Sequence, residues 1–217
     1  MSLTFLGALA LVALAVAVLG TVHAGARNAA MRDRARVFDD VLSAVEDPVV
    51  LRGDGIDYPE LRGRVGGHPV RLRVIVDALV LRKLPVLWLE VVVHQRVPVT
   101  GTVSVLLRPH GGEYFSSNPG FRFELPTPAS FPRTARVAAS TPDTSLDVLE
   151  PLAAFVSEPE TKEVGVGPGG LRAVRLLASA DQGAYRVSRR ASFSGARVPA
   201  FELLRTVELL TQREVTT

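Results

Sequence analysis

The chain has 217 residues, of which 47% are hydrophobic and 22% charged, and its formal net charge at pH 7 is +3. This length suits one folded domain with a sizeable core, and the composition argues against a disordered protein. Cysteine is absent from the sequence, which excludes disulfide frameworks, thiolate metal sites and cysteine nucleophiles. Basic residues are scattered among acidic ones along the whole chain, so we predict no nucleic-acid partner, which would need a clustered basic surface.

Residues 1–24 are predicted to form a transmembrane anchor. No side chain from Leu3 to Val22 is charged, and a helix of this length spans about 30 Å, the thickness of the hydrocarbon core of a bilayer. A secretory signal normally has a basic segment before a shorter apolar core, whereas nothing basic precedes this run. The tripeptide Val22-His23-Ala24 resembles a cleavage site and supports the alternative, a signal that is removed. We favour the anchor, which makes the lipid bilayer the first predicted partner.

Basic residues follow the apolar run and none precedes it. Lys and Arg near a membrane helix favour the cytoplasmic side, so the C-terminal body is predicted to lie in the cytoplasm. The periplasmic side stays open as an alternative, because a long domain can override this bias. The basic residues near the end of the run are Arg27, Arg32, Arg34 and Arg36.

Small residues recur every three or four positions within the apolar run. A face of small residues lets another helix approach closely, which favours packing against a membrane-protein partner or a second copy of this chain. Alanine is also common in this sequence, so composition alone would explain the pattern equally well. The small-residue stripe consists of Gly7, Ala10, Ala13, Ala17, Gly20 and Ala24.

Residues 25–47 are predicted to continue as a juxtamembrane helix that ends before Pro48. Apolar residues at alternating spacings of four and three define one face of this helix. We favour packing of this face on the protein's own domain, and a coiled-coil interface with another chain is the alternative. The face consists of Met31, Ala35, Phe38, Leu42 and Val45.

Residues 48–217 are predicted to form a single α+β domain. Alternating apolar and polar side chains predict a half-buried strand over residues 70–76, preceded by the hairpin turn Gly66-Gly67. Two more strands are expected in residues 84–94 and 100–109. The first of them is apolar on both faces, which places it centrally in the sheet.

A loop rich in Gly and Pro follows in residues 111–132 and carries four aromatic residues. These aromatic side chains are expected either to form a small cluster beneath the loop or to face the bilayer or a neighbouring protein. They are Tyr114, Phe115, Phe121 and Phe123.

The second half of the body is predicted to contain two helices among further strands. A short strand is expected at 133–139, followed by a helix that begins at Thr141-Pro142 and turns Leu146, Leu149, Leu152, Ala153 and Val156 to one side. A hairpin at 161–179, a strand at 183–193 and a helix at 199–214 complete the chain, the helix being apolar at Phe201, Leu204, Val207 and Leu210. Runs of strands between separate helices predict an α+β fold with a mostly antiparallel sheet and two helices.

Residues 165–170, "GVGPGG", match the dinucleotide-binding pattern G-x-G-x-x-G. That site also needs a buried strand before it, a helix after it and an acidic residue about 20 positions on, whereas residue 190 is Arg. A hairpin turn explains the glycines better, so no cofactor is predicted. The four histidines lack the spacing of a metal-binding pair, and no nucleophile motif is present, so neither a metal nor a catalytic residue is predicted.

Residues 58–93 resemble an uncharacterised family of bacterial proteins with one N-terminal transmembrane helix. The resemblance rests on Tyr-Pro at 58–59, Leu-x-Gly-Arg at 61–64 and Arg-Lys-Leu-Pro-x-Leu-Trp-Leu at 82–89. It implies a single-pass protein of the bacterial inner membrane with an α+β body. The resemblance supplies no activity and no catalytic residue.

Three functions are therefore considered. The first is a membrane-anchored accessory or structural subunit of a larger integral-membrane complex, such as a respiratory or photosynthetic one, without catalysis of its own. The second is a membrane-tethered module in the periplasm that binds a ligand or a lipid. The third is an enzyme whose site is not recognisable from the sequence.

Overall fold

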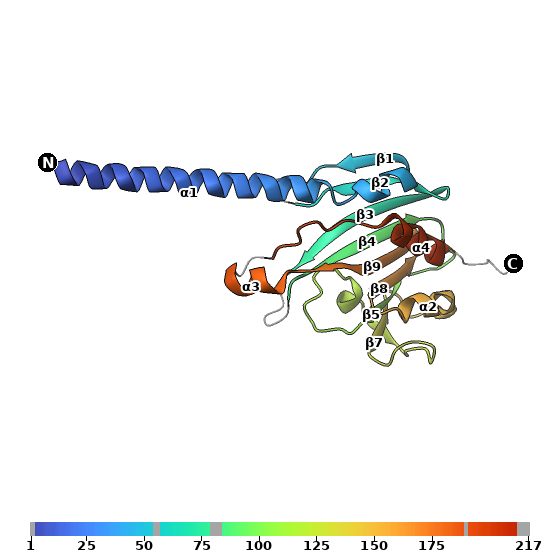
Figure 1. Cartoon of the computed structure of the whole chain (residues 1–217). Helices are drawn as coiled ribbons and strands as arrows, with labels where there is room; N and C mark the ends of the chain where they lie inside the picture. Colours follow the sequence, from blue (N-terminus) through green and yellow to red (C-terminus); the bar gives the residue numbers. More distant parts are fainter. Residues whose placement is uncertain (1–2, 54–56, 79–83, 189–190, 212–217) are drawn as a thin grey trace.

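The computed structural model describes residues 3–53, 57–78, 84–188 and 191–211. A long helix, α1 (Leu3–Ala35), projects from a body that is built around one large sheet (Figure 1). Within the described residues, nine strands form this sheet in the order β1-β2-β3-β4-β9-β8-β5-β7-β6, and each neighbouring pair is antiparallel. The predicted α+β class with an antiparallel sheet is confirmed.

The strands differ in length, and the longest ones lie near the middle of the sheet. Their bounds are β1 (Glu46–Leu51), β2 (Glu60–Val65), β3 (His68–Asp77), β4 (Val86–His94), β5 (Val103–Leu107), β6 (Phe123–Leu125), β7 (Ala135–Ala139), β8 (Thr161–Gly167) and β9 (Gly170–Ser179). As predicted, β4 lies centrally, between β3 and β9, although one of its faces carries the buried Glu90.

Two tight hairpins follow the glycine pairs of the sequence. Gly66 and Gly67 join β2 to β3 with φ angles of 55° and 80°, values that favour glycine at both central positions of such a turn. Pro168 and Gly169 join β8 to β9, which confirms that the "GVGPGG" segment is a hairpin. At Gly170 a Cβ atom would lie 2.1 Å from the carbonyl oxygen of Val93, so only glycine fits this close approach of β9 to β4.

One face of the sheet is covered by helices and forms the hydrophobic core. Helix α4 (Ala200–Thr211), the 3₁₀ helices η1 (Asp39–Ala44) and η3 (Asp147–Leu152), and α2 (Ala153–Val156) supply the covering layer. Leu203 and Leu210 of α4 are fully buried, and each such side chain contributes roughly 1.5–3 kcal/mol through burial. The opposite face carries charged side chains, among them Arg73, Glu90 and Arg172, between apolar ones such as Ile75 and Val174.

The predicted juxtamembrane helix at 25–47 is shorter in the structure. Helix α1 ends at Ala35, a turn follows, and η1 then leads into strand β1, which begins at Glu46. This break turns Val37 and Phe38 into the core of the body, where they are buried. Pro48 is tolerated within β1 because this strand forms an edge of the sheet.

Two further predictions about elements are wrong, and a third is confirmed as far as the described residues extend. The strand predicted at 183–193 is replaced by helix α3 (Gln182–Ser188), since both edges of the preceding strand β9 are already paired, and residues 189–190 lie outside the described residues. The helix expected from Thr141 is reduced to η3 and α2, because Pro151 has no N–H for an α-helical hydrogen bond. Helix α4 confirms the predicted C-terminal helix up to Thr211, but Phe201 and Leu204 are exposed, and residues 212–214 lie outside the described residues.

Candidate functional site

The polar face of the sheet centres on a buried carboxylate in β4. Glu90 is 2% exposed, and its oxygens lie 2.7 Å from Nε of Arg172 and 3.0 Å from Nε of Arg73. Burial alone would raise the pKa of Glu90, but the two guanidinium groups outweigh it and hold the pKa below its usual value. Glu90 is therefore an ionised, fully paired group that joins β3, β4 and β9.

A second paired carboxylate lies beside it on β8. Glu163 accepts a hydrogen bond from the hydroxyl of Ser104 at 2.8 Å and lies 2.7 Å from Nη1 of Arg172. The register of β8 against β9 shifts between Thr161 and Glu163, which is the signature of a β-bulge. Lys162, within this bulge, reaches the loop that follows β5.

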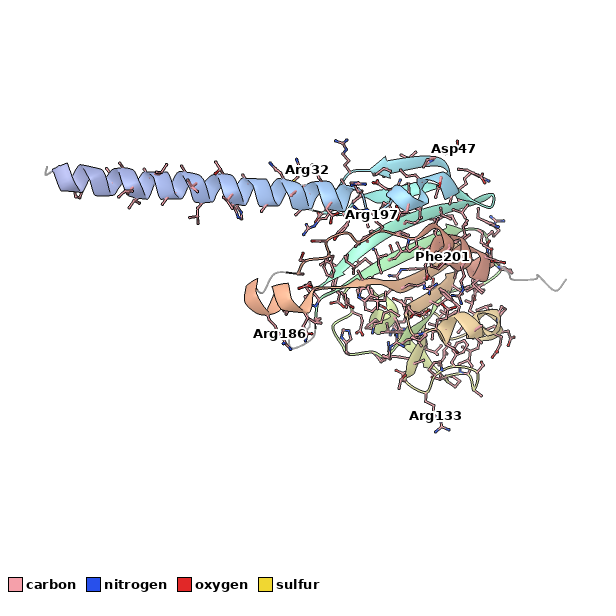
Figure 2. All side chains as sticks on the ribbon, viewed as in Figure 1. Arg32, Asp47, Arg133, Arg186, Arg197 and Phe201 are labelled. Carbon is pink, nitrogen blue, oxygen red and sulfur yellow. The ribbon has the colours of Figure 1, made fainter. Side chains whose placement is uncertain are left out.

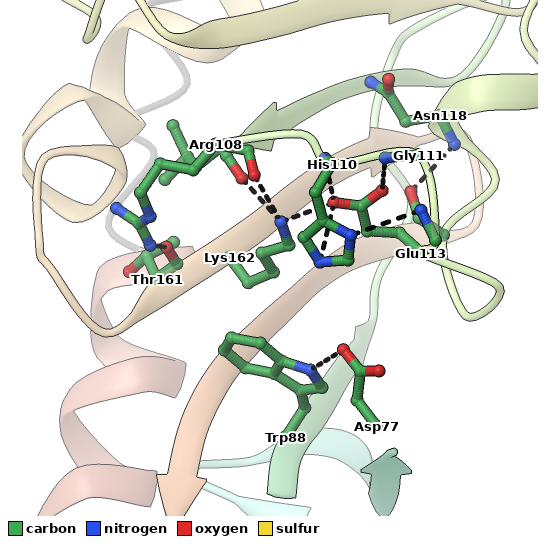
Figure 3. A network of polar contacts seen from close by, with 12 residues as sticks. Asp77, Trp88, Arg108, His110, Gly111, Glu113, Asn118, Thr161 and Lys162 are labelled. Atoms are coloured by element: carbon green, nitrogen blue, oxygen red, sulfur yellow. Dashed lines mark hydrogen bonds and ion pairs between the residues drawn. The ribbon is translucent and has the colours of Figure 1, made fainter. Parts of the chain in front are cut away.

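Lys162 organises the polar network that Figure 3 shows. Its ammonium group donates to the carbonyl oxygens of Leu107 and Arg108 at 3.0 and 2.9 Å and to Oε1 of Glu113 at 2.7 Å. The Glu113 carboxylate also accepts the backbone N–H groups of His110 and Gly111, at 2.9 and 3.0 Å. The loop that begins at Arg108 is thus folded around a buried ion pair.

The hydrogen bonds of this ion pair favour a structural role over a catalytic one. Burial would raise the pKa of Glu113, but the hydrogen bonds from Lys162 and His110 lower it below its usual value. The Lys162 ammonium has three donors, all of them engaged, and in this protonated form it has no lone pair for attack on a substrate. His110 is similarly engaged, since Nδ1 accepts from Gly112 and Nε2 lies 3.3 Å from Glu113.

A cavity of about 250 Å³ adjoins this network. Asp77, at the end of β3, and Trp88, in β4, line it together with Lys162, and the indole N–H of Trp88 donates to Oδ2 of Asp77 at 3.1 Å. The remaining lining residues are Leu84, Pro85, Val86, Arg108 and His110. Asp77 itself is 5% exposed, so its carboxylate is held inside the body.

The four loop aromatics separate into two groups. Tyr114 and Phe115 make an edge-on ring contact, and Phe115 lies 6.1 Å from the ring of Trp88. Tyr114 also donates its hydroxyl hydrogen to the carbonyl oxygen of Val76, which ties the loop to β3. Phe121 and Phe123 lie further along the chain, Phe121 before strand β6 and Phe123 at its first position, and both are half-buried.

The two groups of N-terminal residues that were predicted to form contacts differ in their exposure. The side chains of the small-residue stripe are all exposed, and a Cβ atom added at Gly7 or Gly20 would meet no atom within 4 Å. On the predicted juxtamembrane face, Phe38 and Val45 lie in the core of the body, and Leu42 packs against it. Met31 is half-buried and Ala35 is exposed.

The joint between α1 and the body is built from polar contacts and buried side chains. Oδ1 of Asp33 lies 2.9 Å from Nη2 of Arg197, and its Oδ2 accepts the N–H of Gly195 at 2.9 Å. The N–H of Val198 donates to the carbonyl oxygen of Val37 at 2.9 Å. Figure 2 shows Arg197 where the carboxyl end of α1 meets the body. These contacts fix the direction in which α1 leaves the body.

Sequence inspection did not single out Lys162, Glu113 or Asp77. The available signal was rarity, because the chain has only two lysines, and Lys162 stands at the start of a strand, between Thr161 and Glu163. Lys83, the other lysine, belongs with Arg82 to the family-like segment, and both lie outside the described residues.

The described residues include no group of three or more His, Asp or Glu side chains that could hold a metal ion. In the part of the chain that the structure describes, one helix, α1, is long and apolar enough to cross a membrane. Comparison of the chain with protein-family models, with curated proteins and with solved structures finds no match.

Proposed function

We propose that this protein is a single-pass membrane-anchored subunit of a larger integral-membrane complex, such as a respiratory or photosynthetic one, and that it has no catalysis of its own. The observation that carries the proposal is the uncovered apolar surface of α1. Leu11 and Leu19 are 69% and 72% exposed, and the body covers none of the apolar segment. Lipid or another membrane helix would remove this surface from water.

The small-residue stripe supports a protein partner in addition to lipid. Its exposed backbone would allow a second helix to approach closely, either from another subunit or from another copy of this chain. The fixed joint at Asp33 and Arg197 supports a structural role, because it would hold the body at one orientation to the bilayer. The arginines after the apolar segment favour the cytoplasmic side of a bacterial inner membrane.

A periplasmic ligand-binding module is the second candidate, and the cavity beside Trp88 is the observation that favours it. The two candidates differ in the side of the membrane that the body occupies. A reporter fused after Thr217 distinguishes them: cytoplasmic activity supports the first proposal, and periplasmic activity contradicts it.

Native separation after mild-detergent solubilisation tests the complex directly. We expect the wild-type chain to migrate with a large membrane assembly and Ala17→Leu, on the small-residue stripe, to release it. Ala15→Leu is the matched control, because residue 15 lies on the opposite side of α1 and the substitution is the same. Migration of the wild-type chain as a lone monomer would contradict the proposal.

A further inference from the structure

Buried carboxylates in this body follow a rule, and one of them departs from it. Glu90 is paired with arginines of two strands, Glu113 with Lys162, and Glu163 with Arg172. A buried carboxylate without a partner is costly, and such pairing compensates for its removal from water.

Asp77 is buried to a similar degree, but the described residues give it no such partner. Its Oδ2 accepts the indole N–H of Trp88, a neutral donor, while its Oδ1 is buried and has no hydrogen-bond partner within the described ranges. Nor do the described residues place a basic side chain within ion-pair distance of it. Within the described residues, the carboxylate therefore lacks a donor at Oδ1 and a direct ion-pair partner, and the charge of Lys162 acts on it only from beyond contact distance.

The other polar groups around the cavity are already engaged. Lys162 donates its three hydrogen bonds to Glu113 and to two carbonyl oxygens. Arg108 donates to the carbonyl oxygens of Pro159 and Thr161. Asp77 is therefore the group that a ligand in this cavity would satisfy. It would need a hydrogen-bond donor, and a positive charge would suit it best.

We propose that the cavity beside Trp88 binds a small primary amine, with its ammonium group on Oδ1 of Asp77 and its carbon chain against Trp88, Leu84 and Pro85. A volume of about 250 Å³ lies at the small end for ligand sites, so the cavity suits a small molecule or a single headgroup. The indole ring adds attraction for a cation, and the apolar wall accepts the methylene groups. The amine is either a free metabolite or the ethanolamine headgroup of a lipid.

The single tryptophan of the chain makes this proposal directly measurable, because Trp88 is both the reporter and a wall of the cavity. Full-length protein in detergent is titrated with n-butylamine, and the fluorescence of Trp88 is recorded. We expect a saturable change, and a response to 1-butanol, which has the same shape but no charge, that is at least about tenfold weaker.

Asp77→Asn is expected to weaken the response to n-butylamine by about tenfold or more, since one charge-assisted hydrogen bond is lost. The same variant should melt at an equal or higher temperature than the wild type without amine, because an uncompensated buried charge is removed. Asp143→Asn, an exposed carboxylate in a turn, is the matched control and should bind like the wild type.

Vesicles distinguish the two sources of the amine. A Trp88 response to phosphatidylethanolamine vesicles but not to phosphatidylcholine vesicles identifies the lipid headgroup, and a response to n-butylamine alone identifies a free amine. The proposal is overturned if Trp88 responds equally to butylamine and butanol, or if Asp77→Asn folds and responds like the wild type. None of these outcomes depends on whether the protein belongs to a larger complex.

Discussion

At the scale of single residues, the ion pair of Lys162 and Glu113 shows how a loop without regular structure is held in one conformation. The carboxylate gathers two backbone N–H groups of its own loop, and the ammonium gathers two carbonyl oxygens at the end of β5. Each group would be costly to bury alone, so the two partners depend on each other.

Lys162→Met is expected to lower the free energy of unfolding at pH 7 by about 3–5 kcal/mol, because it leaves the Glu113 carboxylate buried and unpaired. In the wild type, the lowered pKa of Glu113 contributes stability that is fully present above the unfolded pKa of about 4.3 and is lost as the pH falls through the native pKa. The deficit of the variant should therefore shrink in acid, as the carboxyl group takes up a proton. Denaturant titrations between about pH 3 and pH 7, the range in which carboxyl groups titrate, measure the loss of stability and its dependence on pH.

The double variant Lys162→Met, Glu113→Leu is the control for this interpretation. Because both charges are removed together, it should be more stable than Lys162→Met alone. If the two substitutions simply add, the side chains are not coupled and the ion pair does not organise the loop.

At the scale of elements, local sequence patterns correctly predicted those strands and turns that are determined by residues close together in the sequence. Alternation in β3 and the glycine pairs of the two hairpins predicted strands and turns that the structure contains. The strand predicted for the segment that contains α3 was wrong, because a local sequence pattern does not show whether a neighbouring strand has an unpaired edge. Only the order of the strands shows that β9 has no free edge.

Gly170 tests the close contact between two of these elements. Gly170→Ala would place a Cβ atom against the carbonyl oxygen of Val93 and force a φ near +148° on a residue with a side chain. We expect a loss of stability of at least about 1–3 kcal/mol, measured as a shift of the denaturant midpoint. Gly169→Ala, in the same hairpin, meets nothing within 4 Å and should change stability by less than about 1 kcal/mol. Equal effects of the two substitutions would contradict the close approach of β9 to β4.

At the scale of the whole molecule, the sequence separates features that the fold brings together. Lys162 and Glu113 are 49 positions apart, and Glu90 and Arg172 are 82 apart, so no local motif announces either pair. The apolar run of α1 is a local feature and could be predicted from the sequence. The ion pair of Asp33 and Arg197 joins residues 164 positions apart and could not be predicted. Candidate anchors are therefore readable from composition, but the cavity beside Trp88 emerges only when β3, β4 and β8 are aligned.

We expect the joint to hold α1 and the body as a single rigid unit, and spin labels can measure this because the chain has no native cysteine. Spin labels at Gly25→Cys on α1 and Phe201→Cys on α4 should give a narrow distance distribution in lipid nanodiscs. Replacing both Asp33 by Asn and Arg197 by Gln should broaden it, because the ion pair and the hydrogen bond to Gly195 are lost together. Arg36→Gln breaks only an exposed ion pair with Asp39 and should leave the distribution narrow. If the double substitution also leaves it narrow, the buried side chains Val37 and Phe38 hold the two parts together without help from the polar contacts.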